Sequence, residues 1–504
     1  MGNLLSVTDP TGNIAGNHIN AKGLVTKTVD MLGNETDYTY DGDGNKLTET
    51  NAEGHLTTWT YDDNGNVLTQ VLLRTVNGQP ITEITTYEYD ARDRVIATHY
   101  PDGTSMRSEF DAAGNEVASI DTEGRRTETE YDAYGRVNAV RYPDGSSEHK
   151  TYDAEGNLVA ETDTLNRTTT YTYDALNRQT DTQYPDGSVT HTDYDALGRV
   201  LRVINERGAA TEYEYDDAGR RTAVINALSQ SHHYAYDDNG NLIRETDANG
   251  HRTEYEYNDL DQKILTRFHD GSTMEDEFDV MGRKTASIDQ AGTRTEYDYD
   301  TLGRLTAVRQ FLNGTAATQT LTTSYTYDSQ GNKLTQTDAE GRTTEWTYDS
   351  QGRVLSRTLP MGQTESFSYD AAGNRLSHTD FNGQTTTYSY DLNQRLTQVT
   401  YGDGTTERYT YDAVGNRLTA ATPEGTTRYR YDAQNRLVEE VQPNGSVLTY
   451  GYDAAGNRTQ LDVSAGGSTT STSYSFDALN RLEVVADSQG QTLYTYGAVG
   501  NRES

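Results

Sequence analysis

The sequence predicts an all-β protein: an array of about 22 tandem hairpin repeats of 21 residues, forming one continuous antiparallel sheet coiled into a spiral, hollow shell or tube. The motif Tyr-Asp-x-x-Gly-Arg, or the same motif ending in Asn, recurs about 22 times between Tyr40 and Tyr496. Its spacing stays at 21 residues without a break from Tyr89 to Tyr299. In addition, Asn, Asp, Gly and Pro punctuate each repeat too often for helices.

Composition favours a thin sheet over both a thick core and a disordered chain. Only 33% of the 504 residues are hydrophobic, which on its own would suit disorder. However, 38 tyrosines held at a fixed phase are not typical of a solvated tail. A repeat array also overrides the length-based expectation of about three domains. We expect residues 1–36 to be a partial or irregular N-terminal repeat and residues 37–504 to be the array.

Net charge and cysteine content exclude several classes of function. A net charge of −36 argues against a nucleic-acid partner, whose phosphates require Lys and Arg, and disfavours anionic membranes. Solubility explains this charge most simply, and an acidic surface selecting a basic cargo is the alternative. The chain has no Cys, so it has no disulfide, Cys–metal site or Cys nucleophile and can exist in either redox compartment.

Membrane and targeting signals are not found. Residues 1–6 lack the basic and apolar regions of a signal peptide. No apolar run approaches the ~18 residues of a membrane-spanning helix, so we predict no membrane insertion. Residues 2–5 (Gly-Asn-Leu-Leu) match the interior of a repeat, as at residues 156–159, and we therefore expect the chain to begin part-way through an array. Residues 13–30 depart from the motif.

Each repeat carries two turn signals separated by about ten residues. The first follows the Tyr-Asp dyad, and its fourth residue is Gly in 16 copies. The remaining copies have Asn177, Asn435, Asn480, Asp93, Asp261 and Gln394 there. We predict positive φ at this position after a type I turn, with the dyad Asp accepting backbone hydrogen bonds. The second turn reads like residues 338–341 (Asp-Ala-Glu-Gly) or 142–145 (Tyr-Pro-Asp-Gly).

The five- to six-residue stretches between turns are rich in Thr, Tyr, Val, Leu and Arg, which predicts strands. The residue two before the dyad is aromatic in 17 of 22 copies, so Tyr171 and Tyr173, for example, share one face. We expect these rings to stack along the sheet as a structural ladder. The alternative is that the rings form a sugar-binding platform, and the regular spacing of the rings argues against this function.

An odd period of 21 requires an asymmetry if the rings are to remain on one face. We predict two turns of different loop parity or one extra bulge, unless faces alternate and the true unit is two repeats. A period of 42 also exists, because Tyr-Pro-Asp-Gly turns begin at Tyr100, Tyr142 and Tyr184, and Phe268 continues the phase. The four repeats with these turns lack the later aromatic residue, and they have Ser108, Lys150, Thr192 and Asp276 in its place.

Irregular units indicate longer hairpins. The units from Tyr61 to Tyr89 and from Tyr299 to Tyr327 each gain seven residues and an Asn-Gly turn, at 77–78 and 313–314. A smaller expansion lies at residues 464–468. About 44 strands at ~4.8 Å would give a sheet about 200 Å long. We expect it to coil, because long sheets twist and exposed edges promote edge-to-edge or end-to-end self-association.

The repeated motif resembles the RHS/YD-repeat family. Residues 299–305 (Tyr-Asp-Thr-Leu-Gly-Arg-Leu) and 411–418 (Tyr-Asp-Ala-Val-Gly-Asn-Arg-Leu) carry the resemblance, which extends from about residue 30 onward. The family includes bacterial polymorphic toxins, the B and C components of insecticidal Tc toxins, and the animal teneurins. The resemblance implies a long sheet spiralling into a hollow shell, outside the cell or on its surface. In the bacterial members it implies an enclosed toxin or effector polypeptide, often released by autoproteolysis.

One departure from the family pattern concerns the C-terminal end. Family toxins follow the repeats with a core-associated region and a variable toxin, whereas here we expect the repeats to be the last element. In the family, that region cleaves itself with the help of an aspartate, and no residue of this sequence corresponds to that aspartate. The sequence also shows no segment that resembles the plug closing the shell. We therefore expect this chain to form only the wall of such a shell.

No motif indicates enzymatic chemistry or a cofactor. Residues 41–45 (Asp-Gly-Asp-Gly-Asn) resemble the start of a calcium loop, but position 12 is Ala52 and not Glu, so turn chemistry is favoured. His232 and His233 are adjacent, and adjacent strand residues face opposite ways, which disfavours a shared metal. Gly-x-Ser-x-Gly, His-Glu-x-x-His and phosphate-loop patterns are missing. We predict no catalytic, cofactor or metal residues.

The sequence thus favours a structural β-shell scaffold that encapsulates a toxin or effector polypeptide and is not an enzyme. A cell-surface adhesion or glycan-binding repeat module is the alternative function. A downstream toxin domain in the parent gene would support the first, and an upstream membrane anchor would support the second.

Overall fold

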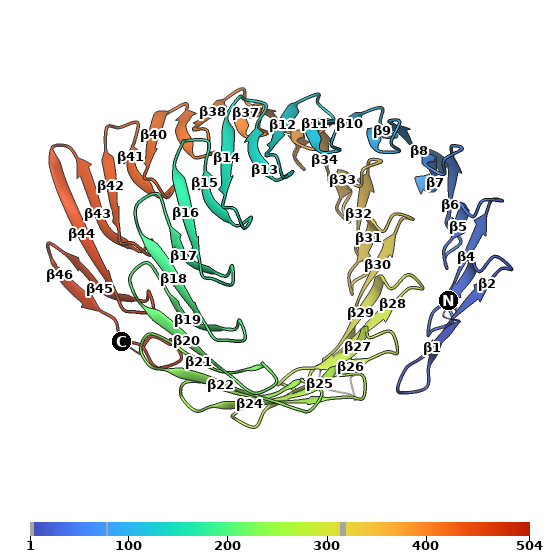
Figure 1. Cartoon of the computed structure of the whole chain (residues 1–504), viewed down its shortest axis with the longest axis horizontal. Helices are drawn as coiled ribbons and strands as arrows, with labels where there is room; N and C mark the ends of the chain where they lie inside the picture. Colours follow the sequence, from blue (N-terminus) through green and yellow to red (C-terminus); the bar gives the residue numbers. More distant parts are fainter. Residues whose placement is uncertain (1–4, 77–78, 313–318, 504) are drawn as a thin grey trace. The chain divides into compact units, whose positions relative to one another are not determined.

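The molecule is built from strands and turns. The computed structural model describes residues 5–76, 79–312 and 319–503, and these contain 46 strands and no helix. Figure 1 shows the strands running in succession along the coloured chain. Within the described residues there is accordingly no helix long and apolar enough to cross a membrane.

The strand bounds are β1 (Ser6–Thr8), β2 (Ile14–Ile19), β3 (Val25–Val29), β4 (Glu35–Tyr40), β5 (Lys46–Thr50), β6 (Leu56–Tyr61), β7 (Val67–Val76), β8 (Gln79–Tyr89), β9 (Val95–His99), β10 (Ser105–Phe110), β11 (Glu116–Ile120), β12 (Arg126–Tyr131), β13 (Val137–Arg141), β14 (Ser147–Tyr152), β15 (Leu158–Thr162), β16 (Thr168–Tyr173), β17 (Gln179–Gln183), β18 (Val189–Tyr194), β19 (Val200–Ile204), β20 (Ala210–Tyr215), β21 (Arg221–Ile225), β22 (Ser231–Tyr236) and β23 (Leu242–Thr246). They continue with β24 (Arg252–Tyr257), β25 (Lys263–Arg267), β26 (Thr273–Phe278), β27 (Lys284–Ile288), β28 (Arg294–Tyr299), β29 (Leu305–Leu312), β30 (Gln319–Tyr327), β31 (Lys333–Thr337), β32 (Thr343–Tyr348), β33 (Val354–Thr358), β34 (Thr364–Tyr369), β35 (Arg375–Thr379), β36 (Thr385–Tyr390), β37 (Leu396–Thr400), β38 (Thr406–Tyr411), β39 (Arg417–Thr422), β40 (Gly425–Tyr431), β41 (Leu437–Val441), β42 (Val447–Tyr452), β43 (Arg458–Ala465), β44 (Ser468–Phe476), β45 (Leu482–Asp487) and β46 (Gly490–Leu493).

These strands form one sheet in which neighbours in the chain pair antiparallel, from β1 with β2 to β45 with β46. Each repeat is a hairpin, and successive hairpins pair with each other in turn. The predicted all-β array of tandem hairpins in one continuous antiparallel sheet is therefore confirmed. Residues 14–29, which depart from the motif, also form a hairpin of this type from β2 and β3.

Both turns of a repeat have the same hydrogen-bond pattern. In the first turn, Asp132 N–H donates to Arg136 O at 2.9 Å and Gly135 N–H donates to Asp132 O at 3.0 Å. In the second, Tyr142 and Gly145 take the equivalent places, both at 2.9 Å. The fourth residue has positive φ in both, and the six residues that replace Gly in the first turn have φ between 57° and 63°. The predicted left-handed position is confirmed even at Gln394, a residue type with little preference for it.

A β-bulge resolves the odd period. Glu214 pairs with Ala223 and the next residue, Tyr215, pairs with Arg221, which leaves Thr222 as the extra residue. The same register shift precedes the dyad aromatic residue in the other recorded pairings of this kind, from β4–β5 to β44–β45. The loops have equal parity, so the asymmetry comes from the predicted bulge. The alternative of alternating faces is wrong, because Tyr213 and Tyr234 lie on one face through Val224 and His232.

The sheet has an aromatic face and a charged face. Tyr213 and Tyr255, on the aromatic face, are half-buried, whereas Glu212 and Glu214 on the opposite face are exposed. The most deeply buried apolar side chains are small ones such as Ala223, which is 0% exposed, and no large side chain among the described residues is fully buried. The prediction of a thin sheet that shields rings without a thick aliphatic core is confirmed.

The expanded units are elongated hairpins. β7 and β8 have 10 and 11 residues, and β29 and β30 have 8 and 9, against 5 and 6 in an ordinary repeat. Their predicted Asn-Gly turns, at 77–78 and 313–314, lie outside the described residues. The expansion near the C-terminus closes on a two-residue turn, because Ala465 pairs directly with Ser468 around Gly466 and Gly467.

The chain divides into two compact units, each made of two long stretches of the sheet. Unit 1 comprises Met1–Phe110, Ser119–Arg125 and Glu254–Thr385. Unit 2 comprises Asp111–Ala118, Arg126–Thr253 and Thr386–Ser504. Hairpins that are far apart in the sequence therefore belong to the same unit. The parts before residue 254 are called the N-terminal stretch of each unit below, and the later part is called the C-terminal stretch.

Candidate functional site

The dyad aspartate holds its own turn together. The Oδ1 atom of Asp132 accepts hydrogen bonds from the N–H groups of Tyr134 at 2.8 Å and Arg136 at 3.0 Å. Its Oδ2 atom accepts from Arg136 Nε at 2.7 Å. In Asn-type repeats the amide replaces the guanidinium, as Asn157 Nδ2 donates to Asp153 Oδ2 at 2.9 Å and thereby lowers the pKa of Asp153. This carboxylate is occupied by turn chemistry, as predicted from the motif.

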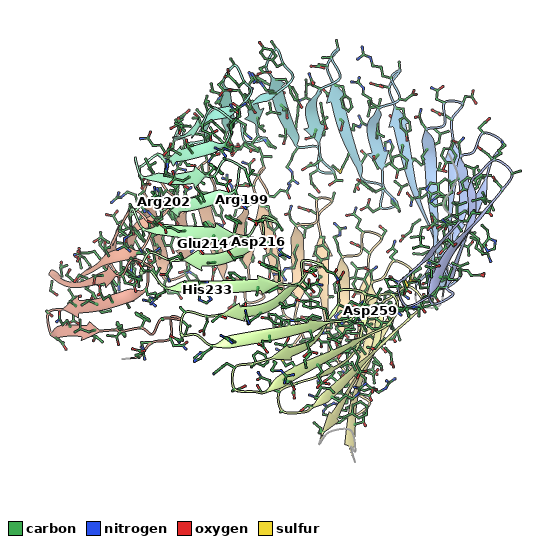
Figure 2. All side chains as sticks on the ribbon, turned by 60° about the horizontal axis from the view of Figure 1, so that its bottom comes forward. Arg199, Arg202, Glu214, Asp216, His233 and Asp259 are labelled. Atoms are coloured by element: carbon green, nitrogen blue, oxygen red, sulfur yellow. The ribbon has the colours of Figure 1, made fainter. Side chains whose placement is uncertain are left out.

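The dyad tyrosine ties one repeat to the previous one. The hydroxyl of Tyr152 donates to the carbonyl of Val137, 15 residues earlier, at 2.9 Å. Its ring lies under the guanidinium of Arg136, 4.6 Å away, and Arg136 Nη1 reaches the carbonyl of Asp153 at 3.4 Å. Figure 2 shows the related pair Arg199 and Asp216 at the same end of their strands. Each Arg-type turn is therefore joined to the next by a cation–π contact and, except at Arg94, whose Nη1 has no partner among the described residues, by a hydrogen bond.

Cations stand between the other row of rings. Lys333 Nζ lies 5.8 Å from the ring of Tyr325 and 4.1 Å from that of Trp346 in the next repeat. Arg458 bridges Tyr450 and Tyr474 in the same way, at 6.0 and 5.0 Å. The shared face of the rings was predicted, but the direct stacking expected between them is replaced here by ring–cation–ring contacts. The signal was present in the sequence, because Lys or Arg recurs just after the first turn.

Second-turn aromatic residues use the same face in the repeats with a 42-residue period. The hydroxyl of Tyr100 contacts Met106 Sδ at 3.3 Å, and Met106 pairs with Thr98, which in turn pairs with Tyr87. The turn ring therefore shares a face with the ladder aromatic of the preceding repeat. In repeats where Ser108 or Lys150 replaces the later aromatic residue, the ring of the second turn therefore lies on the aromatic face.

A pairing rule couples the first turns of successive repeats. Each of the six non-glycine residues at the positive-φ position follows a repeat whose fifth turn residue is Asn, whereas every Arg there is followed by Gly. Asn157 Nδ2 donates to Asn177 Oδ1 at 3.0 Å, and Asn416 Nδ2 donates to Asn435 Oδ1 at 2.7 Å. In the Arg type, a Cβ on Gly156 would lie 3.5 Å from Arg136 Nη1, which leaves little room for a longer side chain.

The candidate metal ligands are engaged in local contacts. Asp41 Oδ1 accepts the N–H groups of Asp43 at 2.9 Å and of Asn45 at 2.8 Å, so it faces into its own turn. His232 and His233 pair with Val224 and Ala223 and therefore point to opposite faces. Figure 2 shows His233 on β22, where its Nε2 lies 3.0 Å from Ser231 Oγ. Among the described residues, no group of three or more His, Cys, Asp or Glu could hold a metal ion.

The charged face carries ion networks between strands. His191 Nδ1 lies 2.7 Å from Asp181 and its Nε2 lies 3.0 Å from Asp193, and Arg202 Nε donates to Asp193 at 2.8 Å. Asp181 and then Asp193 raise the pKa of His191. The four residues come from β17, β18 and β19, with Arg202 labelled in Figure 2. The arrangement contains no nucleophile and links neighbouring strands by charge.

Turn-to-turn contacts join the two stretches of unit 1. Glu53, in a second turn, accepts from Arg304 Nη2, in a first turn, at 2.7 and 2.8 Å. Asp102 Oδ2 accepts from Gln351 Nε2 at 2.6 Å. Glu123 Oε1 accepts the N–H of Ala371 at 2.7 Å. These partners are 248 to 251 residues apart, and the row that they form is called the seam below.

The seam has the same construction within unit 2. Asp144 Oδ2 accepts from Asn393 Nδ2 at 2.7 Å, 249 residues away. Asp186 lies 3.5 Å from Arg436 Nη2. Second turns of the N-terminal stretch therefore meet first turns of the C-terminal stretch in both units. The seam consists mainly of carboxylates facing amide and guanidinium groups.

Two asparagines with positive φ strengthen the seam of unit 2. Asn435 Oδ1 accepts from Arg167 Nη2 at 2.9 Å in addition to Asn416. Asn480 Oδ1 accepts from Arg207 Nη1 at 2.9 Å and from Asn457 Nδ2 at 2.7 Å. Sequence reasoning missed the seam, because contacts about 250 residues apart leave no local pattern. The only available signal was the run of carboxylates at the third position of successive second turns.

Comparison with protein families gives the assignment. The RHS Repeat family matches over most of the chain, at residues 20–56, 61–105, 110–147, 152–189, 194–230, 236–268, 327–364, 348–385, 369–406, 390–427, 411–447 and 431–469. The chain belongs to the RHS repeat family. The predicted resemblance is thereby confirmed, and no curated protein sequence matches the chain.

Solved structures share the fold of this RHS array. The crystal structure of TcdB2-TccC3 is 15% identical with a TM-score of 0.60, and the match covers 98% of this chain and 37% of that one. The Tc holotoxin pore of Photorhabdus luminescens is 15% identical with a TM-score of 0.62, over 97% of this chain and 30% of that one. A third structure, TcdB2-TccC3-TEV, is 15% identical with a TM-score of 0.58, over 98% and 39%. The RHS array thus spans about a third of the length of these toxin chains.

Proposed function

We propose that this RHS array is a structural β-scaffold, a wall that encloses a toxin or effector polypeptide in its parent protein. The single observation that carries the proposal is the seam. A sheet one layer thick cannot bury a core of its own, and its hairpin ends expose polar groups unless they are covered. Contacts between turns about 250 residues apart cover these ends with another stretch of the same sheet.

The side-chain chemistry supports a scaffold over an enzyme. The motif residues Tyr, Asp, Arg and Asn are engaged in contacts within and between repeats, as described for Tyr152 and Asp153. Apart from Asn258 and Gly497, every dyad provides the same turn carboxylate. The buried Glu365 lies 3.0 Å from His378 Nε2, but among the described residues no group of three or more His, Cys, Asp or Glu could hold a metal ion. We therefore infer a non-enzymatic protein, located outside the cell or on its surface as in the toxins that share its fold.

Cryo-electron microscopy of the purified full chain tests the scaffold proposal. The expected image is a wall of stacked sheet around a lumen. A flat ribbon or a solid rod would refute enclosure.

A protection assay tests whether the wall can shield a polypeptide. An unstructured reporter with a specific protease site, fused after Ser504, should be cut more slowly than the same reporter alone. The matched control carries Arg167→Ala and Arg207→Ala, which remove seam contacts without touching the repeat motif. Protection that is equal in the two fusions would mean that the closed seam is not what shields the reporter.

A further inference from the structure

Unit 2 has two turn edges that are not part of its seam. The first-turn edge is formed by the turns at residues 132–136, 153–157, 174–178 and 195–199 of the N-terminal stretch. The second-turn edge is formed by the turns at residues 401–405 and 422–425 of the C-terminal stretch. The seam itself uses the opposite ends of these two stretches, as in the contact between Asp144 and Asn393.

The first-turn edge exposes large apolar side chains. Tyr134, Leu176 and Leu197, each at the third position of its turn, are 84%, 66% and 78% exposed. In the seam of unit 2, the equivalent position holds an amide that donates across to the other stretch at Asn393 and at Gln434, and it holds Leu479 in the turn that contacts Arg207. The three apolar residues occupy matching positions, with the exposed Glu155 between Tyr134 and Leu176, and their exposure costs solubility unless it is covered.

Cations accompany these apolar residues. Arg136, Arg178 and Arg199 occupy the fifth positions of the same three turns. The corresponding arginines of the C-terminal stretch face carboxylates of the seam, with Arg395 3.7 Å from Asp144 and Arg436 3.5 Å from Asp186. The first-turn edge therefore carries the cationic half of a seam.

The second-turn edge carries the acidic half. Asp403 Oδ1 accepts the N–H of Thr405 at 2.9 Å and its hydroxyl at 2.7 Å, while Oδ2 has no partner among the described residues. Asp144 and Asp186 use Oδ1 in the same way and their Oδ2 atoms in the seam. Glu424 follows Asp403 by 21 residues and is exposed.

The two edges also match in spacing. Arg178 and Arg199 are 21 residues apart, as are Asp403 and Glu424, so each pair is separated by one hairpin of the same sheet. An edge with cations at this interval can meet an edge with carboxylates at this interval, as it does in the seam. The seam already shows the same complementarity in charge and in spacing between a first-turn edge and a second-turn edge.

We propose that the first-turn edge of one copy docks onto the second-turn edge of a second copy of this chain. The contact covers Tyr134, Leu176 and Leu197 and places Asp403 and Glu424 opposite first-turn arginines. It joins two different surfaces, so it is heterologous and adds copies in one direction. The net charge of −36 opposes association at low salt, and near physiological ionic strength the screening length of about 8 Å leaves the local contact in place.

Sedimentation velocity on two complementary variants of the full chain tests this contact. The first variant, Leu176→Asp with Leu197→Asp, alters only the first-turn edge. The second, Asp403→Lys with Glu424→Lys, alters only the second-turn edge. The wild-type chain should associate as its concentration rises, and each variant alone should weaken association by at least about tenfold. An equimolar mixture of the two variants should form a dimer and stop there, because one intact edge of each kind remains.

Controls separate docking from misfolding. Leu376→Asp changes an apolar residue that is 41% exposed in unit 1 and should associate like the wild type. The single variants Leu197→Asp and Asp403→Lys replace any double variant whose melting curve departs from that of the wild type, and they are mixed in the same way. A wild-type chain that stays monomeric across the concentration range, or variant mixtures that form no dimer, would overturn the proposal.

Discussion

At the scale of single residues, the repeat motif divides three tasks among its members. Asp132 holds the turn, Arg136 bridges to the next repeat, and Tyr152 bonds back to the backbone of the previous one. Each contact is modest, with a net value of about 0.5–1.5 kcal/mol for a hydrogen bond. Repetition along the sheet makes the sum large, as in other arrays whose stability adds over nearest neighbours.

The pairing rule predicts a coupling between Arg136 and Gly156. Gly156→Asn should destabilise the chain, because the guanidinium occupies the space beside that residue. In the Arg136→Asn background the same change should be better tolerated, since it recreates the pair formed by Asn157 and Asn177. Denaturant unfolding of the four proteins in a double-mutant cycle should give a favourable coupling of about 0.5 kcal/mol or more. Additive effects would contradict the rule.

The aspartates of the turns predict acid lability. The side chain of Arg94 lowers the pKa of Asp90 to about 2, from an ordinary value of 3.8. Because the folded pKa lies below the unfolded one, the stabilisation is complete above about pH 4 and is lost as the pH falls through the folded value. Denaturant midpoints should therefore be flat from about pH 7 to 5 with respect to this group and should decline below about pH 4.

A matched variant identifies the group responsible for the acid response. Asp90→Asn should have a lower free energy of unfolding than the wild type near neutral pH. Its free energy of unfolding should also fall less than that of the wild type when the pH is lowered. His191 acts with the opposite sign, since its pKa is raised from 6.5 and its contribution is lost as the pH rises through the folded value. An unchanged acid response in Asp90→Asn would contradict the role assigned to this carboxylate.

At the scale of the element, the hairpin was predictable almost completely. Turn residues with intrinsic preferences fixed both loops, and the odd period required an asymmetry that the bulge at Thr222 supplies. The location of the bulge was not predictable, because the two loops and the two strands were equally able to accommodate it. The ring–cation contacts were not predicted, because a basic residue such as Lys333 stands outside the aromatic pattern and its position between two rings depends on the register of three strands.

Turn conformation predicts opposite effects of the same substitution at two positions. Gln394 has φ of 63°. Gln394→Gly should therefore stabilise the chain, by roughly 0.5–1 kcal/mol, because only the conformational strain is relieved. Asn435→Gly, where φ is 62°, should destabilise it, because the hydrogen bonds from Asn416 and Arg167 are lost. Thermal unfolding of the two variants checks the signs, and equal effects would show that backbone strain alone decides stability here.

At the scale of the whole molecule, the sequence predicted one continuous coiled sheet and left the contacts of its edges open. The fold class followed from period and turn chemistry, which are local properties. The seam depends on which turns meet after about 250 residues, and this offset is the sum of many small twists between strands. The carboxylates at Asp102, Asp144 and Asp186 could be seen in the sequence, but their partners could not.

The seam offset is the central claim, and cysteine cross-linking measures it directly because the chain has no native Cys. Asp144→Cys with Asn393→Cys replaces a pair whose side chains meet at 2.7 Å, 249 residues apart. A short bis-maleimide should join these two cysteines within one chain, as read by mass spectrometry of the linked peptides. Asp186→Cys with Asn393→Cys, two repeats out of register, should remain unlinked under the same conditions. Equal linking of the two pairs, or linking of neither, would contradict a sheet that returns alongside itself at this offset.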